Sequence, residues 1–173
     1  MRLEEVLRFR EKKAQLQQKL MKEHPGAVIV SLGMNIPGPV KCSPLIRTAF
    51  YEGMERLEEL LGRERKETLY KVLLEECAGY AAIYLTGETE LYRIKKETVS
   101  LEETHPLGRI WDIDVFADGR EAVEREAVGA QRRKCLLCGC DAKECARSRN
   151  HETGELQKKV TEIILHWQAG KES

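Results

Sequence analysis

The order of apolar segments between residues 27 and 117 is the feature that most constrains how this chain can fold. Runs of β-prone residues alternate with stretches of helical periodicity, and glycine, proline or a capping residue separates neighbouring segments. The predicted elements are a strand at 27–34, a helix at 43–61, strands at 68–75 and 79–85, a helix at 88–103 and a strand at 109–117. The segment 68–76 also fits a helix.

This β-α-β-β-α-β order predicts an α+β fold with an antiparallel sheet of the ferredoxin-like type, which also underlies polymerase palm domains. We expect an added hairpin strand at 121–128, because Asp118-Gly119 is a hairpin turn signal. N-terminal and C-terminal helices at 2–22 and 153–168 should flank the sheet. One face of the sheet should stay open to carry a site, although the fold alone does not define a function.

The last strand of the series carries two aspartates in a run of β-prone residues. Because side chains alternate across a strand, Asp112 and Asp114 should share one face while Trp111, Ile113 and Val115 point into the core. Two neighbouring carboxylates repel each other unless a cation lies between them, and Mg²⁺ suits one or two carboxylates with water and substrate phosphate. The pair therefore indicates a metal-assisted phosphoryl or nucleotidyl transfer site. A half-exposed strand with a solvated acidic face would explain the same residues.

Basic and glycine residues in three segments are candidates for holding an anionic substrate. They are Asn35, Gly38, Lys41 and Arg47 at a strand-to-helix junction, Gly108 and Arg109 before the aspartates, and Arg132, Arg133, Arg147 and Arg149 in the tail. Helix N-terminal amides attract anions, glycine allows close backbone approach, and arginine binds phosphate bidentately. We group Arg109 with the two aspartates as catalytic. An ordinary loop and solvated surface charges are the alternative explanation.

The tail indicates a different kind of site, because Cys135-x2-Cys138-x6-Cys145-x5-His151 supplies four soft ligands in a short span. A Cys-x2-Cys pair places two thiolates on one side of a tetrahedral metal, and a later cysteine and histidine can close a structural zinc site. The x6 gap is not a standard zinc-finger spacing, so unliganded thiols near a substrate site are the alternative. Cys140 is not needed as a ligand.

Composition excludes several classes of protein. Lys plus Arg and Asp plus Glu both number 29, which does not favour a general nucleic-acid-binding surface. No apolar run is long enough for a membrane span, and the charged N-terminus is not a signal peptide. Six cysteines in such a chain favour free thiols or metal ligands in the cytoplasm.

The length of 173 residues suits one domain, 1–173. Within it we distinguish an α/β catalytic core at 27–128, a Cys/His-rich segment at 132–151 and a C-terminal helix at 153–168. The sequence does not reveal the oligomeric state.

Three sequence blocks together carry a resemblance to a known family. They are Asn-Ile-Pro-Gly-Pro-Val-Lys at 35–41, His-Pro-Leu-Gly-Arg-Ile-Trp-Asp-Ile-Asp-Val at 105–115, and Arg-Lys-Cys-Leu-Leu-Cys at 133–138 with Cys-Ala-Arg-Ser-Arg-Asn-His at 145–151. In this order they resemble the citrate lyase holo-[acyl-carrier protein] synthases, also called apo-citrate lyase phosphoribosyl-dephospho-CoA transferases. The likeness spans roughly residues 27–165, and Cys140 and the N-terminal helix are not tied to it.

The resemblance implies a nucleotidyltransferase-type reaction on a protein substrate. Triphosphoribosyl-dephospho-CoA would be the donor, a serine of the citrate lyase acyl carrier protein (gamma subunit) would be the acceptor, and pyrophosphate would leave. Asp112 and Asp114 would hold Mg²⁺, and basic groups would hold the rest of the donor. A third metal-binding acid cannot be ranked among Glu88, Glu102, Glu103 and Asp118.

The competing class is a non-enzymatic zinc-knuckle module that binds RNA or a protein. Only 6% of the residues are Phe, Trp or Tyr, which argues against a platform on which single-stranded nucleic acid stacks. Magnesium-dependent release of pyrophosphate would separate the two classes.

Overall fold

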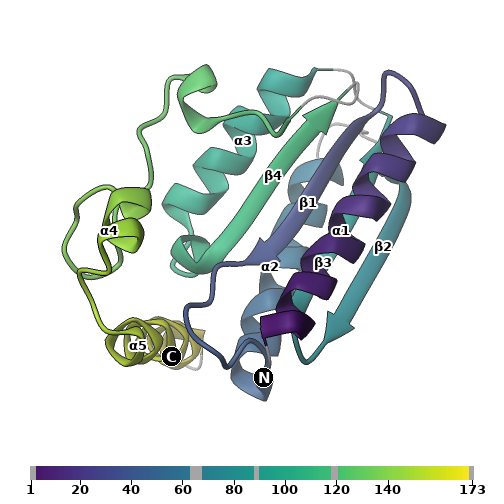
Figure 1. Cartoon of the computed structure of the whole chain (residues 1–173). Coiled ribbons are helices and arrows are strands. Elements are labelled where there is room, and N and C mark those ends of the chain that lie inside the picture. The colour runs from purple at the N-terminus through teal and green to yellow at the C-terminus, as the bar shows by residue number, and fades with distance from the viewer. Residues whose placement is uncertain (1–2, 63–67, 88–89, 118–120, 172–173) are drawn as a thin grey trace.

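A four-stranded antiparallel sheet forms the centre of the computed structural model, which describes residues 3–62, 68–87, 90–117 and 121–171 (Figure 1). The strands are β1 (Val28–Met34), β2 (Thr68–Glu76), β3 (Gly79–Thr86) and β4 (Trp111–Ala117). Their order across the sheet is β2-β3-β1-β4, and all neighbours pair antiparallel. The central strands β1 and β3 are buried along almost their whole length, whereas β2 and β4 are the edges.

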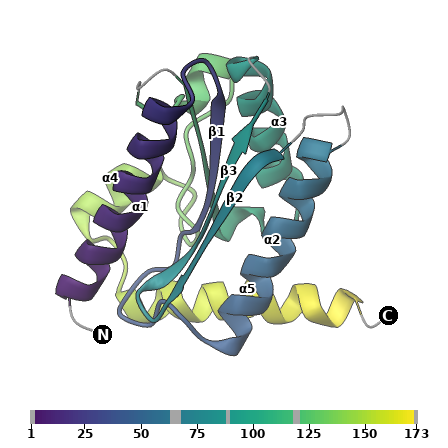
Figure 2. The ribbon, with the colours of Figure 1, turned by 90° about the vertical axis from the view of Figure 1, so that its right-hand side faces the viewer.

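Helices cover both faces of this sheet (Figure 2). The helices α2 (Pro44–Gly62) and α3 (Leu91–Thr104) pack on one face, and α1 (Leu3–Glu23) lies on the opposite face. The helix α5 (Thr153–Lys171) crosses one end of the sheet and contacts α2. A short helix, α4 (Ala142–Ser148), and two 3₁₀ turns, η1 (Gly108–Ile110) and η2 (Arg125–Val128), complete the described elements.

The side-chain alternation of β1 divides the core between the two faces. Val28, Val30 and Leu32 belong to the main core under α2 and α3, whereas Ile29 packs with Leu20 of α1. The largest fully buried side chain, Trp111, donates a hydrogen bond from Nε1 to the Ala49 carbonyl of α2 at 3.0 Å. This bond satisfies the polar atom of the indole inside the core and ties the start of β4 to α2.

The predicted order of helices and strands from 27 to 117 is confirmed, and 68–76 is a strand rather than a helix. Ser43 caps α2 as expected, since its Oγ accepts a hydrogen bond from the Ile46 amide at 3.1 Å. The fold is therefore α+β with a four-stranded antiparallel sheet, five helices and a cysteine cluster among the described residues. None of the helices in the described part of the chain is both long and apolar enough to cross a membrane.

Two expectations about the sheet are wrong. The stretch 121–128 is not a strand, because 121–124 has no regular structure and the rest forms η2. A backbone bond returns to the sheet there from the Val123 amide to the Val115 carbonyl at 2.9 Å. Side chains of Lys95, Glu102 and Arg133 bind the backbone of Trp111 and Ile113 farther along the β4 edge. The sheet face that carries the aspartates is also not fully open, because α1 packs on it over β1 and β3, although Asp112 and Asp114 at the β4 edge stay partly exposed. The Asp118-Gly119 turn lies outside the described residues.

Candidate active site

Two aspartates project from the edge strand β4 on the face that carries α1. Burial alternates along the strand, so that Trp111, Ile113 and Val115 are buried while the side chains of Asp112 and Asp114 are 52% and 32% exposed. This alternation confirms the predicted shared face of the pair. The neighbouring positions on β1 are Gly33 and Ser31, whose small side chains leave room beside the carboxylates.

The helix α1 contributes a cation to this face that sequence reasoning missed. The Nζ atom of Lys13 lies 3.7 Å from Oδ2 of Asp114. Burial raises the pKa of the Asp114 carboxyl, the charge of Asp112 raises it further, and Lys13 opposes both effects. A signal for Lys13 does exist in the sequence, because it lies at helical spacing between Phe9 and Leu16 in the stripe that α1 buries.

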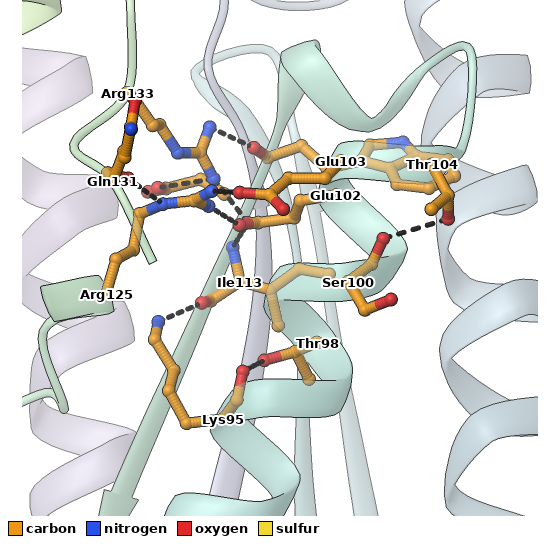
Figure 3. A network of polar contacts seen from close by, with 12 residues as sticks. Lys95, Thr98, Ser100, Glu102, Glu103, Thr104, Ile113, Arg125, Gln131 and Arg133 are labelled. Atoms are coloured by element: carbon orange, nitrogen blue, oxygen red, sulfur yellow. Dashed lines mark hydrogen bonds and ion pairs between the residues drawn. The ribbon is translucent and has the colours of Figure 1, made fainter. Parts of the chain in front are cut away.

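Two buried side chains of α3 bind the backbone of Ile113, the residue between the two aspartates on β4 (Figure 3). The Ile113 amide donates to Oε1 of Glu102 at 2.8 Å, and Nζ of Lys95 donates to the Ile113 carbonyl at 3.0 Å. Both charged side chains are only 4% exposed. An edge strand normally presents these backbone groups to solvent or to another strand. Lys95 and Glu102 therefore fix β4 at the residue that separates the two carboxylates.

Glu102 also organises two arginines from the segment after β4 (Figure 3). Arg125 donates to its Oε2 at 2.6 Å, and Arg133 pairs with its Oε1. Arg133 also donates to the Trp111 carbonyl at 2.7 Å and lies 3.9 Å from Oδ1 of Asp112. Burial raises the pKa of Glu102, although Arg133, the Ile113 amide and Lys95 lower it. The carboxyl group thus places a guanidinium group directly beside the acidic strand.

A cavity of about 1080 Å³ opens between this network and the Cys/His-rich segment. Its size is at the upper end of ordinary ligand sites, which span about 300–1,000 Å³. Six basic side chains line it, against four carboxylates: Arg109, Arg125, Arg132, Arg133, Lys134 and Arg149, with Glu102, Glu103, Glu152 and Glu155. A large cavity with this excess of cationic groups suits a large polyanion.

A second, smaller cavity of about 130 Å³ lies on the α1 side of the sheet. Its wall includes Asp112 and three cations, Arg10, Lys13 and Lys41. Lys41 donates from Nζ to the Ile36 carbonyl, and burial together with Arg10 lowers its pKa. Asp112 is therefore flanked by Arg133 on one side and by the cations of this cavity on the other.

The structure brings most, but not all, of the predicted binding residues together. Asn35, Gly108, Arg109, Arg132, Arg133 and Arg149 line the large cavity, and Lys41 lines the small one. Gly38 has φ +75° and packs so closely on α5 that a Cβ atom would lie 2.6 Å from Gln157. Arg47 instead pairs with Glu75 at 3.1 Å, and Arg147 is exposed on α4, so neither borders the two cavities.

The acid candidates for a further metal ligand have other contacts or lie elsewhere. Glu102 binds the Ile113 amide and two arginines, and Glu103 pairs with Arg125 at 2.6 Å. Glu88 and Asp118 lie outside the described residues. Lys95 was missed, and Glu102 was considered only as a metal ligand and not as a support of β4. Both are charged positions on the buried face of a predicted helix, which is the only sequence signal they give for this role.

The four predicted soft ligands converge. The ligand atoms of Cys135, Cys138, Cys145 and His151 all lie within 4.8 Å of one another. Close contact with His151 lowers the pKa of the Cys138 thiol to about 6, yet the buried Nε2 atom of His151 makes no hydrogen bond of ordinary geometry within the described chain. Three of the four residues, all but Cys138, also line the large cavity.

An acidic strand beside a large basic cavity is typical of transferases that act on phosphorylated substrates. The family model described as apo-citrate lyase phosphoribosyl-dephospho-CoA transferase matches residues 1–167. The chain therefore belongs to the apo-citrate lyase phosphoribosyl-dephospho-CoA transferase family.

Individual relatives agree with this assignment. A probable apo-citrate lyase phosphoribosyl-dephospho-CoA transferase of Streptococcus pyogenes serotype M18 is 33% identical over 94% of this chain and 84% of its own length. The protein of the same name from Vibrio cholerae serotype O1 (strain M66-2) is 32% identical over 93% of this chain and 90% of its own length. The match to Protein CitXG of Leuconostoc mesenteroides subsp. cremoris covers 98% of this chain but 36% of that longer protein, at 31% identity. A binding module without activity is not favoured by these relatives.

Proposed function

We propose that this protein attaches the 2'-(5''-phosphoribosyl)-3'-dephospho-CoA prosthetic group to a serine of the citrate lyase acyl carrier protein, its gamma subunit. The donor is triphosphoribosyl-dephospho-CoA. The observation that carries the proposal is the position of Asp112, 3.9 Å from an arginine that also lines the large basic cavity. This contact supports a site in which the paired carboxylates act next to a cavity that takes a large polyanionic donor. Family membership supports the same reaction.

The reaction exchanges a phosphoanhydride bond of the triphosphate for a phosphate ester bond to serine. The serine oxygen attacks the phosphorus atom next to the ribose, the bond from that phosphorus to the bridging oxygen breaks, and pyrophosphate leaves with the bonding electrons. The serine proton passes to solvent or to a base. The result is a phosphodiester between the carrier and the prosthetic group. We propose that Arg133 and Arg109, which both line the large cavity, bind the negative charge of the phosphates.

We propose Mg²⁺ as the ion that Asp112 and Asp114 hold. Two carboxylates on one strand face supply hard oxygen ligands, and their partial exposure leaves room for water and phosphate oxygens to complete the shell. When bound, Mg²⁺ would neutralise charge that builds up on the phosphates during transfer. Lys13 lies against Asp114 and would give up part of this ion pair to the metal.

We also propose that the sheet is of the ferredoxin-like, palm-type arrangement. The order β2-β3-β1-β4, the antiparallel pairing and the position of α2 and α3 on one face support this. None of the six cysteines, all of which lie in the described residues, forms a disulfide, which supports a cytoplasmic location.

A direct test of the proposed function is incubation of the purified protein with the donor and apo acyl carrier protein. Intact mass spectrometry of the carrier should show addition of one prosthetic group, with stoichiometric release of pyrophosphate. Omission of Mg²⁺ should stop the reaction and its addition should restore it. A carrier mass that stays unchanged with active donor and Mg²⁺ would refute the proposal.

Lys41 should affect donor binding more than turnover. It lies in the small cavity with Asp112, so Lys41→Ala removes a cation close to the acidic strand. We expect the apparent KM for the donor to rise about tenfold, the equivalent of about 1.4 kcal/mol, with a smaller change in kcat. Steady-state kinetics with varied donor measure both constants.

Arg47→Ala is the matched control for Lys41→Ala. Arg47 comes from the same predicted strand-to-helix junction, but it pairs with Glu75 and borders neither cavity. Its removal should leave the donor KM within about twofold of the unmodified enzyme. A larger rise in KM for Arg47→Ala than for Lys41→Ala would show that the donor binds elsewhere.

A further inference from the structure

We infer that Cys135, Cys138, Cys145 and His151 bind one structural Zn²⁺ ion, and that this ion holds the basic wall of the large cavity in place. The zinc site itself is independent of the proposed function. The role of the ion in holding the cavity wall rests on the proposed function, since it assigns this wall to donor binding.

The sulfur positions fit a tetrahedral zinc ion. With Zn–S bonds of about 2.3 Å, two thiolates of a tetrahedral site lie about 3.8 Å apart. The Sγ atom of Cys145 lies 3.5 Å from that of Cys135 and 3.9 Å from that of Cys138. A disulfide needs about 2.05 Å between sulfurs and would join only two of the three. All four ligand atoms lie within 4.8 Å of one another, close enough for one metal ion to bind them together.

The histidine supplies a second, independent observation. Its Nε2 atom is buried and makes no hydrogen bond of ordinary geometry to the described residues, although it lies within the cluster of thiols. A buried imidazole nitrogen without a partner is costly, because it has lost its hydrogen bond to water. A metal ion at the centre of the cluster would satisfy it.

The segment that carries these ligands has almost no hydrophobic core of its own. From 121 to 150 the only buried residues are Cys135 and Cys145. Protein segments of this size usually need a metal, a disulfide or a partner to hold one conformation. The cysteines thus occupy the place that apolar side chains would take in a larger unit.

The local backbone brings the ligands together from both ends of the segment. A tight turn joins Cys135 to Cys140, with a backbone hydrogen bond of 2.6 Å between them and Gly139 at φ +72°. Asp141 then caps α4 by accepting from the amides of Lys143 and Glu144, and α4 carries Cys145 to the turn. Cys138 projects from this turn, and His151 follows the end of α4.

The same backbone carries the basic wall of the cavity. Arg133 and Lys134 come immediately before Cys135, and Arg149 lies two positions before His151. The Lys134 carbonyl also accepts a hydrogen bond from Arg109. Because Lys134 and Arg149 adjoin the metal ligands, loss of the ion should release this part of the wall. Arg133, β4 and the aspartates should keep their own supports from Glu102, the Trp111 carbonyl and Lys95.

Metal analysis tests whether the four residues bind zinc. Full-length protein purified without chelator from zinc-supplemented medium should contain about one Zn²⁺ per chain. Replacement by Co²⁺ should produce the visible absorption of a tetrahedral thiolate site. Cys138→Ser should lose the zinc, whereas Cys140→Ser, in the same turn but outside the cluster, should keep it. Zinc well below stoichiometry in the unmodified protein, or equal loss in both variants, would overturn the site.

Chelation of the folded, unmodified protein tests, without any variant, whether the zinc ion holds the basic wall of the large cavity. Removal of zinc, followed by addition of Mg²⁺ alone, should lower the melting temperature and raise the donor KM about tenfold, with a smaller change in kcat. Re-addition of Zn²⁺ should reverse both effects. Bound zinc whose removal leaves the donor KM unchanged would disprove the role of the wall but not the metal site. Absence of any transfer by the zinc-loaded protein would count against the proposed function instead.

Discussion

Asp112→Asn and Asp114→Asn should each fold normally and lose transfer by roughly two to four orders of magnitude. Asparagine has nearly the size of aspartate and can still coordinate through its carbonyl, but it lacks the charge that holds the metal. Both side chains are partly exposed, so neither change opens a cavity in the core. Asp114→Asn also weakens the contact with Lys13, which should change stability by less than about 1 kcal/mol. A thermal melt beside a carrier-modification assay measures both effects.

Glu75→Gln provides a control for the aspartate variants. Glu75 is a partly exposed acid on the opposite edge strand, β2, where it pairs with Arg47. Loss of this charge should leave the transfer rate within about twofold of the unmodified enzyme. If the aspartate variants were as active as this control, the two acids would be only a solvated strand face.

Glu102→Ala should be the most destabilising of the variants considered, at about 3–5 kcal/mol. The change leaves Arg125 and Arg133 without their buried counter-ion and the Ile113 amide without its acceptor. Natural domains of this kind are stable by only about 5–15 kcal/mol, so the loss is a large fraction of the total. Equilibrium unfolding in urea measures it, with the m-value as a check that unfolding stays two-state.

A change at the neighbouring acid, Glu103, separates the effect of burial on stability from the effect of charge alone. Glu103 pairs with the same Arg125 at 2.6 Å, but its side chain is 54% exposed. Glu103→Ala should therefore cost less than about 1 kcal/mol. Equal destabilisation by the two changes would mean that Glu102 is an ordinary surface ion pair and that Arg133 and β4 are positioned by other contacts.

The sequence was sufficient to predict the elements that rest on local patterns. The β-α-β-β-α-β order, the shared face of Asp112 and Asp114, and the convergence of the Cys/His ligands all follow from periodicity or spacing. The expected strand at 121–128 failed because tertiary contacts decide what pairs with an edge. Lys95 and Glu102 satisfy the Ile113 backbone from α3, and no local pattern in β4 reports these distant side chains.

Contacts between residues far apart in the sequence also explain why Lys13 was not predicted as part of the site. Lys13 is about a hundred positions from Asp114 in the chain, and only the packing of α1 on the sheet brings them together. Arg47 shows the converse case, because it follows the same loop as Lys41 yet projects toward Glu75 of β2. Lys41 lies in the loop before α2 and lines the small cavity with Asp112, whereas Arg47 lies in the first turns of α2, whose direction turns it toward β2.

The most direct test of the proposed mechanism is the carrier mass after incubation with the double variant Asp112→Asn/Asp114→Asn. The reaction should contain saturating donor, apo acyl carrier protein and Mg²⁺, and a thermal melt should show that the variant is folded. If the two carboxylates hold the ion that assists transfer, the carrier keeps its unmodified mass while the unmodified enzyme converts it completely. A folded double variant that modifies the carrier at nearly the rate of the unmodified enzyme would contradict the mechanism.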